Sequence, residues 1–256
     1  MQLYYRTEGN PDKPALVILH GLFGSSDNWL TMAKILAEEY YVVLPDACNH
    51  GQSPHSNEFN YSQMAQDVVD LLDSLNLDAV YLVGHSMGGK TAMHLAATFP
   101  ERVKKLVVVD ISPRYYQPHH QTILAGLHNL PLATIKTRRD ADKELSNHIT
   151  ELGVRQFLLK NLDRTPEGYK WRMNLPVITD NIENVGEALE ADMRYDGPTL
   201  FIDGETSSYI KADDIDLIRK HFPQAKVETI ANAGHWVQAE QPEAFKDALE
   251  DFLTEK

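Results

Sequence analysis

The sequence predicts an α/β protein with a mostly parallel β-sheet, interrupted by a mostly helical insert. Short β-rich apolar runs alternate with helical patterns over the first 110 residues. This alternation stops near Pro113 and resumes at Gly197-Pro198. Alternating strands and helices of these lengths pair in parallel, with helices on both faces. A chain of 256 residues, 43% of them hydrophobic, can bury such a core without disulfides or metal.

The first half of the chain supplies most of the predicted core elements. Met64, Val68, Leu71, Leu72 and Leu75 recur at helical spacing. In order, the pattern predicts a strand at Ala15–Leu19, a helix at Asp27–Glu39, a strand at Tyr41–Leu44, a helix at Tyr61–Asn76, a strand at Ala79–Val83, a helix at Met87–Phe99 and a strand at Leu106–Val109.

The second half contains the insert and the return to the core. Between Pro113 and Arg194 the pattern is helical, most clearly at Leu152–Leu162. Residues 1–112 and 195–256 are therefore predicted to form the core, and residues 113–194 a mostly helical insert. The core resumes with a strand at Thr199–Asp203, a helix at Ala212–Phe222, a strand at Lys226–Ile230 and a helix at Pro242–Leu253.

Charge and composition exclude several classes of protein. Acidic residues number 37 and basic residues 24, so the net charge is −13. This field repels nucleic-acid phosphates and anionic lipid surfaces, so we expect neither as a partner. The single Cys48 cannot form an internal disulfide, which favours a reducing, cytoplasmic location. Neither a secretory signal nor an apolar stretch near the ~20 residues of a membrane span is visible.

A nucleophile candidate lies at Gly84-His85-Ser86-Met87-Gly88. This G-x-S-x-G motif stands between a predicted strand and a predicted helix, the context that exposes a serine on a sharp turn. Only small residues fit two positions either side of that serine. The pattern predicts Ser86 as a nucleophile at the carboxyl edge of the sheet.

The same stretch also matches a phosphate-binding P-loop. Gly84–Thr91 satisfies G-x-x-x-x-G-K-[ST], and Asp110 after an apolar strand resembles a Mg²⁺-binding position. The two interpretations exclude each other, because one turn exposes a side chain and the other wraps backbone N–H groups around an anion. A P-loop explains neither His235 nor the loop at His20-Gly21.

Other loops at the same edge supply the partners of a serine nucleophile. His235 follows the last predicted strand, where a general base can reach Ser86. The His20–Gly24 loop can offer a backbone N–H from Leu22, with Phe23 as the alternative. With the N–H of Met87 it would form an oxyanion hole.

These motifs resemble the α/β-hydrolase superfamily, and most closely its YbfF-type esterase branch. The resemblance rests on HGLFGS, DACNHGQSP, GHSMGGKTAM, VVVDISP and NAGHWVQAEQP, and weakly on Trp171–Asn174. It implies an α/β-hydrolase fold with a helical cap and a serine esterase active on small acyl esters, without metal or organic cofactor. Many relatives have Arg in the loop where this chain has Cys48.

The acid of the triad is a choice among three residues. In many α/β-hydrolases it lies three residues beyond a Gly, and here that position after Gly204 is Ser207. Asp203 and Glu205 do not have the expected offset. Asp110 ends the strand beside that of the nucleophile, and the YbfF-type branch resembles this arrangement. We therefore predict Ser86, Asp110 and His235 as the triad.

The insert is expected to roof the site and line an apolar pocket. We predict Phe23, Phe157, Trp171 and Trp236 as substrate-binding residues. His119-His120 has no third ligand at metal spacing and is predicted to be a solvated loop.

The predicted function is a serine carboxylesterase, acting through an acyl-enzyme on a small-molecule acyl ester or thioester, as a monomer or small homo-oligomer. The alternatives are an acyl-CoA thioesterase of this fold, a P-loop NTPase, and a catalytically silent ligand-binding protein.

Overall fold

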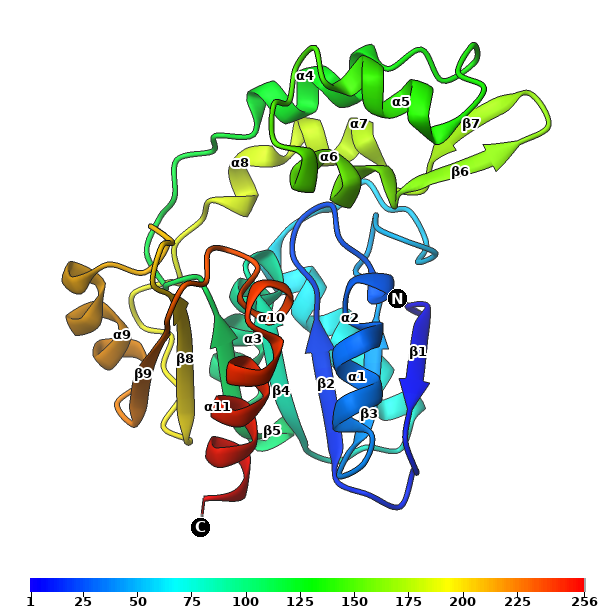
Figure 1. The fold of residues 1–256 in the computed structure, drawn as a ribbon. Helices are drawn as coiled ribbons and strands as arrows, with labels where there is room; N and C mark the ends of the chain where they lie inside the picture. Colours follow the sequence, from blue (N-terminus) through cyan, green and yellow to red (C-terminus); the bar gives the residue numbers. More distant parts are fainter. Residues whose placement is uncertain (256) are drawn as a thin grey trace.

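The computed structural model describes residues 1–255 and shows a seven-stranded sheet covered by helices (Figure 1). The strands lie in the order β1-β3-β2-β4-β5-β8-β9. β1 is antiparallel to β3, and the other neighbours are parallel. Their bounds are Tyr5–Glu8 (β1), Ala15–Leu19 (β2), Tyr41–Pro45 (β3), Val80–His85 (β4), Val103–Val109 (β5), Thr199–Gly204 (β8) and Ala225–Ile230 (β9). The predicted fold class is confirmed.

Helices bury both faces of this sheet because successive strand residues point to opposite sides. α1 (Leu30–Leu36) and α11 (Pro242–Thr254) cover one face. α2 (Tyr61–Ser74), α3 (Met87–Thr98) and α9 (Ile215–His221) cover the other. The short α10 (Val237–Glu240) precedes α11.

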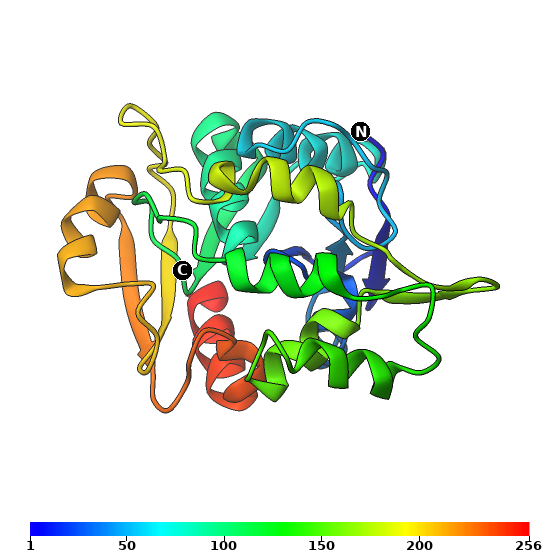
Figure 2. The ribbon, with the colours of Figure 1, turned by 90° about the horizontal axis from the view of Figure 1, so that it is seen from above.

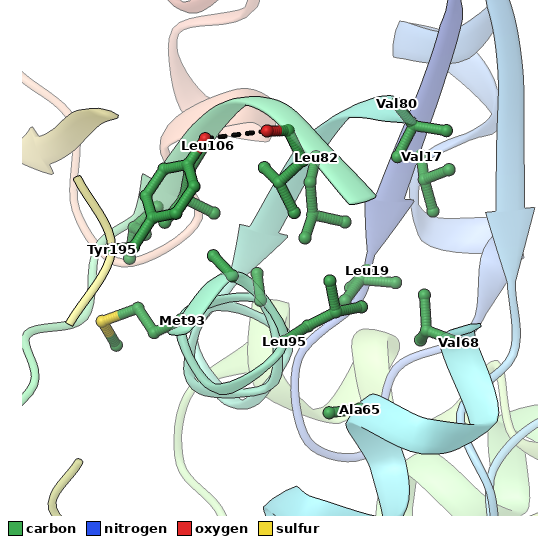
Figure 3. Packing of buried hydrophobic residues seen from close by; sticks show 14 of the residues in the cluster. Val17, Leu19, Ala65, Val68, Val80, Leu82, Met93, Leu95, Leu106 and Tyr195 are labelled. Atoms are coloured by element: carbon green, nitrogen blue, oxygen red, sulfur yellow. Dashed lines mark hydrogen bonds between the residues drawn. The ribbon is translucent and has the colours of Figure 1, made fainter. Parts of the chain in front are cut away.

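The core beneath α2 and α3 fixes the position of the helix that follows β4. Figure 3 shows Val17, Leu19 and Leu82 of the sheet close to Ala65 and Val68 of α2 and to Leu95 of α3. Burying each large aliphatic side chain stabilises the fold by about 1.5–3 kcal/mol. The start of α3 is thereby held at the carboxyl edge of β4.

The segment between β5 and β8 lies across the carboxyl ends of the parallel strands (Figures 1 and 2). We call residues 113–194 the insert. Its elements are α4 (Gln121–Asn129), α5 (Arg138–Leu145), α6 (Leu152–Leu159), β6 (Leu162–Thr165), β7 (Gly168–Trp171), α7 (Leu175–Asp180) and α8 (Ile182–Val185). Its apolar core is continuous with Leu22, Phe23 and Met87 from the loops at the sheet edge.

Local structure differs from the sequence-based prediction in three kinds of feature: a hairpin, the starts of two helices and an edge strand. The insert contains the β6–β7 hairpin, which polar LDRT and GYKW did not signal. The predicted helices Asp27–Glu39 and Ala212–Phe222 each begin with a 3₁₀ turn, at Ser26–Asn28 and Ala212–Asp214. Strand β1 was not predicted, because it is a short edge strand with a half-buried pattern. Within residues 1–255, no helix has the length and apolarity needed to cross a membrane.

Candidate active site

Ser86 lies on a sharp turn between β4 and α3. Its backbone has φ 53° and ψ −117°, a strained combination for a residue with a side chain. Its N–H donates to the Val109 carbonyl at 3.0 Å, which ties the turn to β5. A Cβ at Gly84 would lie 2.2 Å from the Gly88 carbonyl oxygen, and one at Gly88 would lie 2.3 Å from that of Leu19. Only glycine fits either position, as the motif predicts.

Asp110 and His235 meet beside this turn. Asp110 follows β5 with φ 50°, and its N–H donates to the Ile202 carbonyl at 2.8 Å. Its fully buried carboxylate oxygen Oδ2 lies 2.6 Å from Nδ1 of His235. This distance indicates a charge-assisted hydrogen bond donated by Nδ1–H. The other imidazole nitrogen, Nε2, is then free to accept a proton.

The carboxylate of Asp110 has two further donors. The Ser207 hydroxyl donates to Oδ2 at 2.6 Å, and the Gly204 N–H donates to Oδ1 at 3.3 Å. Burial raises the pKa of Asp110, and these two hydrogen bonds oppose that shift. Ser207 occupies the position, three residues after Gly204, where many α/β-hydrolases have the acid. In this chain its hydroxyl donates a hydrogen bond to Asp110 instead.

The other acid candidates have different partners. Asp203 lies beside Asp110, and its Oδ2 accepts from the Thr229 hydroxyl at 3.4 Å. Burial, reinforced by the neighbouring Asp110, raises the pKa of Asp203 to about 7. Glu205 is exposed and accepts from the Asn232 N–H at 2.8 Å. Within residues 1–255, Asp110 is the carboxylate that bonds the imidazole of His235.

Two side chains that the sequence did not single out hold His235. The Tyr209 ring stacks on the imidazole at 4.1 Å between centroids and 19° between planes. Nε2 of His85 lies 2.8 Å from the His235 carbonyl oxygen and donates to it. Burial lowers the pKa of His235 to about 4, so the imidazole is neutral at pH 7. His85 stands directly before Ser86 in the motif. Its closeness to the candidate nucleophile is the sequence signal that could have identified it.

The loop after β2 presents the Leu22 N–H as a backbone donor for the site. The Phe23 N–H donates to Nε2 of His50 at 3.2 Å, so Phe23 is excluded as the alternative oxyanion donor in this conformation. The Leu22 N–H has no acceptor among residues 1–255. Met87 begins α3, where the first N–H groups lack acceptors within the helix. Leu22 and Met87 therefore remain the proposed pair.

A cavity of about 530 Å³ opens beside Ser86 and His235. Phe23, Phe157 and Trp236 line it, and the last two rings lie 5.5 Å apart between centroids. Trp171 does not line it, contrary to the prediction. Its indole N–H donates to the Leu127 carbonyl at 3.2 Å, which places the ring in the core of the insert.

The His119-His120 pair lies in a loop, as predicted, with His119 exposed and His120 half-buried. Both residues line the cavity, and Nε2 of His119 lies 3.0 Å from the Tyr209 hydroxyl. The described residues contain no cluster of three or more His, Cys, Asp or Glu side chains arranged for a metal ion.

Lys90 and Cys48 are both buried, and neither has the environment that its alternative role requires. Nζ of Lys90 donates to the carbonyls of Arg114 at 2.6 Å and Glu187 at 2.7 Å. A P-loop lysine must instead reach a nucleotide phosphate, so the structure contradicts that alternative. Burial raises the pKa of the Cys48 thiol to about 11, which removes the thiolate needed for nucleophilic attack.

Comparison with known proteins agrees with this geometry. The family model for the alpha/beta hydrolase fold matches residues 14–242. The chain belongs to the α/β-hydrolase family. The resemblance predicted from the motifs is therefore confirmed.

Its relatives within the α/β-hydrolase family include named esterases and lipases. It is 42% identical to the sn-1-specific diacylglycerol lipase ABHD11 of Mus musculus over 98% of this chain and 84% of that protein. It is 39% identical to esterase YbfF of Escherichia coli, over 94% of this chain and 93% of that protein. A solved marine microorganism esterase superimposes with TM-score 0.95 at 41% identity, covering 98% of this chain and 99% of that one. This α/β-hydrolase is an enzyme acting on ester bonds.

The turn at Ser86 predicts opposite effects for two Gly→Ala substitutions. Gly88→Ala forces a Cβ against the Leu19 carbonyl and should lower the free energy of unfolding by about 1–3 kcal/mol. Gly153→Ala is the control, because its Cβ would have no neighbour within 4 Å, and stability should stay equal or rise by up to about 1 kcal/mol. Thermal unfolding of both variants tests this, and equal midpoints would contradict it.

Proposed function

We propose that the protein is a serine carboxylesterase in which Ser86, His235 and Asp110 form the catalytic triad. The observation that carries the proposal is the 2.6 Å contact between Asp110 and Nδ1 of His235, beside the strained turn of Ser86. Ser86 and His235 face the same cavity. The relatives named esterases and lipases support the same class of reaction.

The first half of the proposed reaction acylates the serine. Nε2 of His235 takes the proton from the Ser86 hydroxyl as its oxygen attacks the carbonyl carbon of the ester. The N–H groups of Leu22 and Met87 stabilise the oxyanion that forms. Asp110 holds the imidazole in the required tautomer and stabilises its cation. The imidazolium then protonates the departing alcohol, which leaves an acyl-enzyme.

The second half releases the acid. His235 takes a proton from water, the resulting hydroxide attacks the acyl carbon, and the proton returns to Ser86 as the acid departs. Water must therefore enter on the side of His235. The cavity beside that imidazole offers the space for it.

The insert is proposed to act as a cap that selects substrates. Its Phe157 faces Trp236 of the core across the cavity, and Asn161 donates to the Phe23 carbonyl at 2.6 Å. Both contacts link the insert to the loops around Ser86. The insert therefore shapes the chamber in which an ester must bind, while the reacting groups come from the core.

Substitution of Ser86 tests the nucleophile. Ser86→Ala should fold normally and lose esterase activity by on the order of 10⁴-fold or more, because the attacking oxygen is gone. A fluorophosphonate probe should label the wild type and not this variant. Ser146→Ala, on the surface of the insert, is the control and should behave as wild type. Labelling that persists in Ser86→Ala would refute the assignment.

Substitution of the acids tests Asp110 against its neighbours. Asp110→Asn should stay folded and lose about 10⁴-fold in kcat, because the amide no longer fixes the tautomer of His235. Asp203→Asn and Glu205→Gln keep the Asp110–His235 contact and should lose far less. Steady-state kinetics distinguish the three. A large loss of kcat in Asp203→Asn, together with a nearly normal kcat in Asp110→Asn, would overturn the assignment.

The pKa of His235 predicts the pH dependence of the reaction. Above this pKa the imidazole is neutral and can act as a base. Activity therefore falls as the pH drops through the pKa of His235. Because burial lowers the pKa of His235 to about 4, the acidic limb of kcat/KM should lie well below the ordinary 6.5. Tyr209→Leu removes the stacked ring and should move the limb upward. A wild-type limb at 6.5 or above would contradict this.

A further inference from the structure

Two compartments of very different size meet at Ser86. The large one is the cavity of about 530 Å³, walled by α6 and by the loop from His235 to Glu240. The small one measures about 30 Å³ and is walled on its far side by Tyr61, Ile182 and Val185. Both include Ser86, and they share Leu22, His119, His120 and Tyr209 as the boundary between them.

Because Ser86 lies where the two compartments meet, an ester bound there can extend one half into each. This compartment has room for about two waters, so it accepts a short group of roughly acetyl size. Longer chains would have to displace the walls. The large compartment, at about 530 Å³, can hold a bulky group.

Hydrogen bonds hold the walls of the small compartment in place. The Tyr61 hydroxyl donates to the Val185 carbonyl at 2.6 Å. The Tyr116 N–H donates to the Gly186 carbonyl at 2.8 Å, which pairs the two ends of the insert. Buried Lys90 joins both ends to α3 through the Arg114 and Glu187 carbonyls. Moving these walls apart means breaking part-buried hydrogen bonds, whose groups then lack partners.

The position of His235 decides which half of the ester enters which compartment. His235 lines the large compartment and not the small one. The departing alcohol oxygen must receive its proton from this imidazole, so the alcohol lies on the large side. The water that later attacks the acyl-enzyme must arrive on the same side. The acyl group is left for the small compartment.

We propose that the preferred substrates are esters of a short, acetyl-sized acyl group with a bulky apolar alcohol. This rests on the esterase function proposed above. Ile182 closes the acyl side and is the residue that restricts acyl length, while Ile123, Phe157 and Trp236 line the alcohol side.

Three isomeric esters test the proposal with equal composition. Octyl acetate has the short half on the acyl side, methyl nonanoate has it on the alcohol side, and pentyl pentanoate has two equal halves. We expect kcat/KM for octyl acetate to exceed each of the others by at least about tenfold, since one methylene too many in a closed pocket can cost that much.

A matched pair of Ile→Ala variants locates the restriction. Ile182→Ala enlarges the small compartment and should raise kcat/KM for octyl pentanoate relative to octyl acetate, which has the same alcohol, by about tenfold. Ile123→Ala makes the same chemical change in the large compartment and should leave that ratio unchanged. Both side chains are partly buried in the same apolar cluster, so their effects on stability should be similar.

The outcomes separate the substrate proposal from the function on which it rests. Equal rates on the three isomers, or a preference for methyl nonanoate, would overturn the assignment of the compartments while leaving the esterase intact. An equal shift of the ratio in both Ile→Ala variants would also overturn it. Turnover of none of the esters, together with no fluorophosphonate labelling of Ser86, would refute the esterase function itself.

Discussion

The backbone ladder of the sheet continues past the ends of the strands, and the candidate site depends on it. Ser86 N–H bonds the Val109 carbonyl, and Asp110 N–H bonds the Ile202 carbonyl. These bonds fix two residues with positive φ, each a strain of about 1–3 kcal/mol. The sheet can hold them because β4, β5 and β8 are buried on both faces. The site is therefore strained where the fold is most rigid.

Buried neutral histidines fix the loops around this edge. Nε2 of His20 accepts from the Ala47 N–H at 2.9 Å, and its Nδ1 donates to the Gly21 carbonyl at 2.8 Å. His50 similarly joins the Phe23 N–H to the Cys48 carbonyl. Burial lowers the pKa of both histidines, so each ring keeps one donor and one acceptor at neutral pH. A protonated ring would lose the acceptor that each loop needs.

The sequence was sufficient to predict the core and to single out Ser86 as the candidate nucleophile, because both leave local patterns. Val80–Val83 reads as a buried strand, and the glycines around Ser86 are required by backbone contacts at 2.2 and 2.3 Å. The direction of a side chain in the insert has no such local signal. Neither the neighbours of Trp171 nor those of Phe157 in sequence indicate that the former packs against the core of the insert and the latter faces the cavity.

Contacts between distant segments could not be deduced from spacing. Ser207 reaches Asp110 across 97 positions, and the His85 side chain meets the His235 backbone across 150. The β6–β7 hairpin is stabilised by pairing and by the close approach of Gly168 to the Leu132 carbonyl, not by its polar sequence. These features depend on how the finished fold brings loops together.

The insert leaves and rejoins the core at one point, where the Leu189 N–H donates to the Pro113 carbonyl at 2.8 Å. Lys90 joins this junction to α3, the helix that follows the turn at Ser86. Sequence between the two anchors can therefore lengthen, shorten or be exchanged without altering the strand ends that hold Ser86, Asp110 and His235. A scaffold joined in this way can exchange its insert over evolution, while the inherited strand ends beneath stay constant.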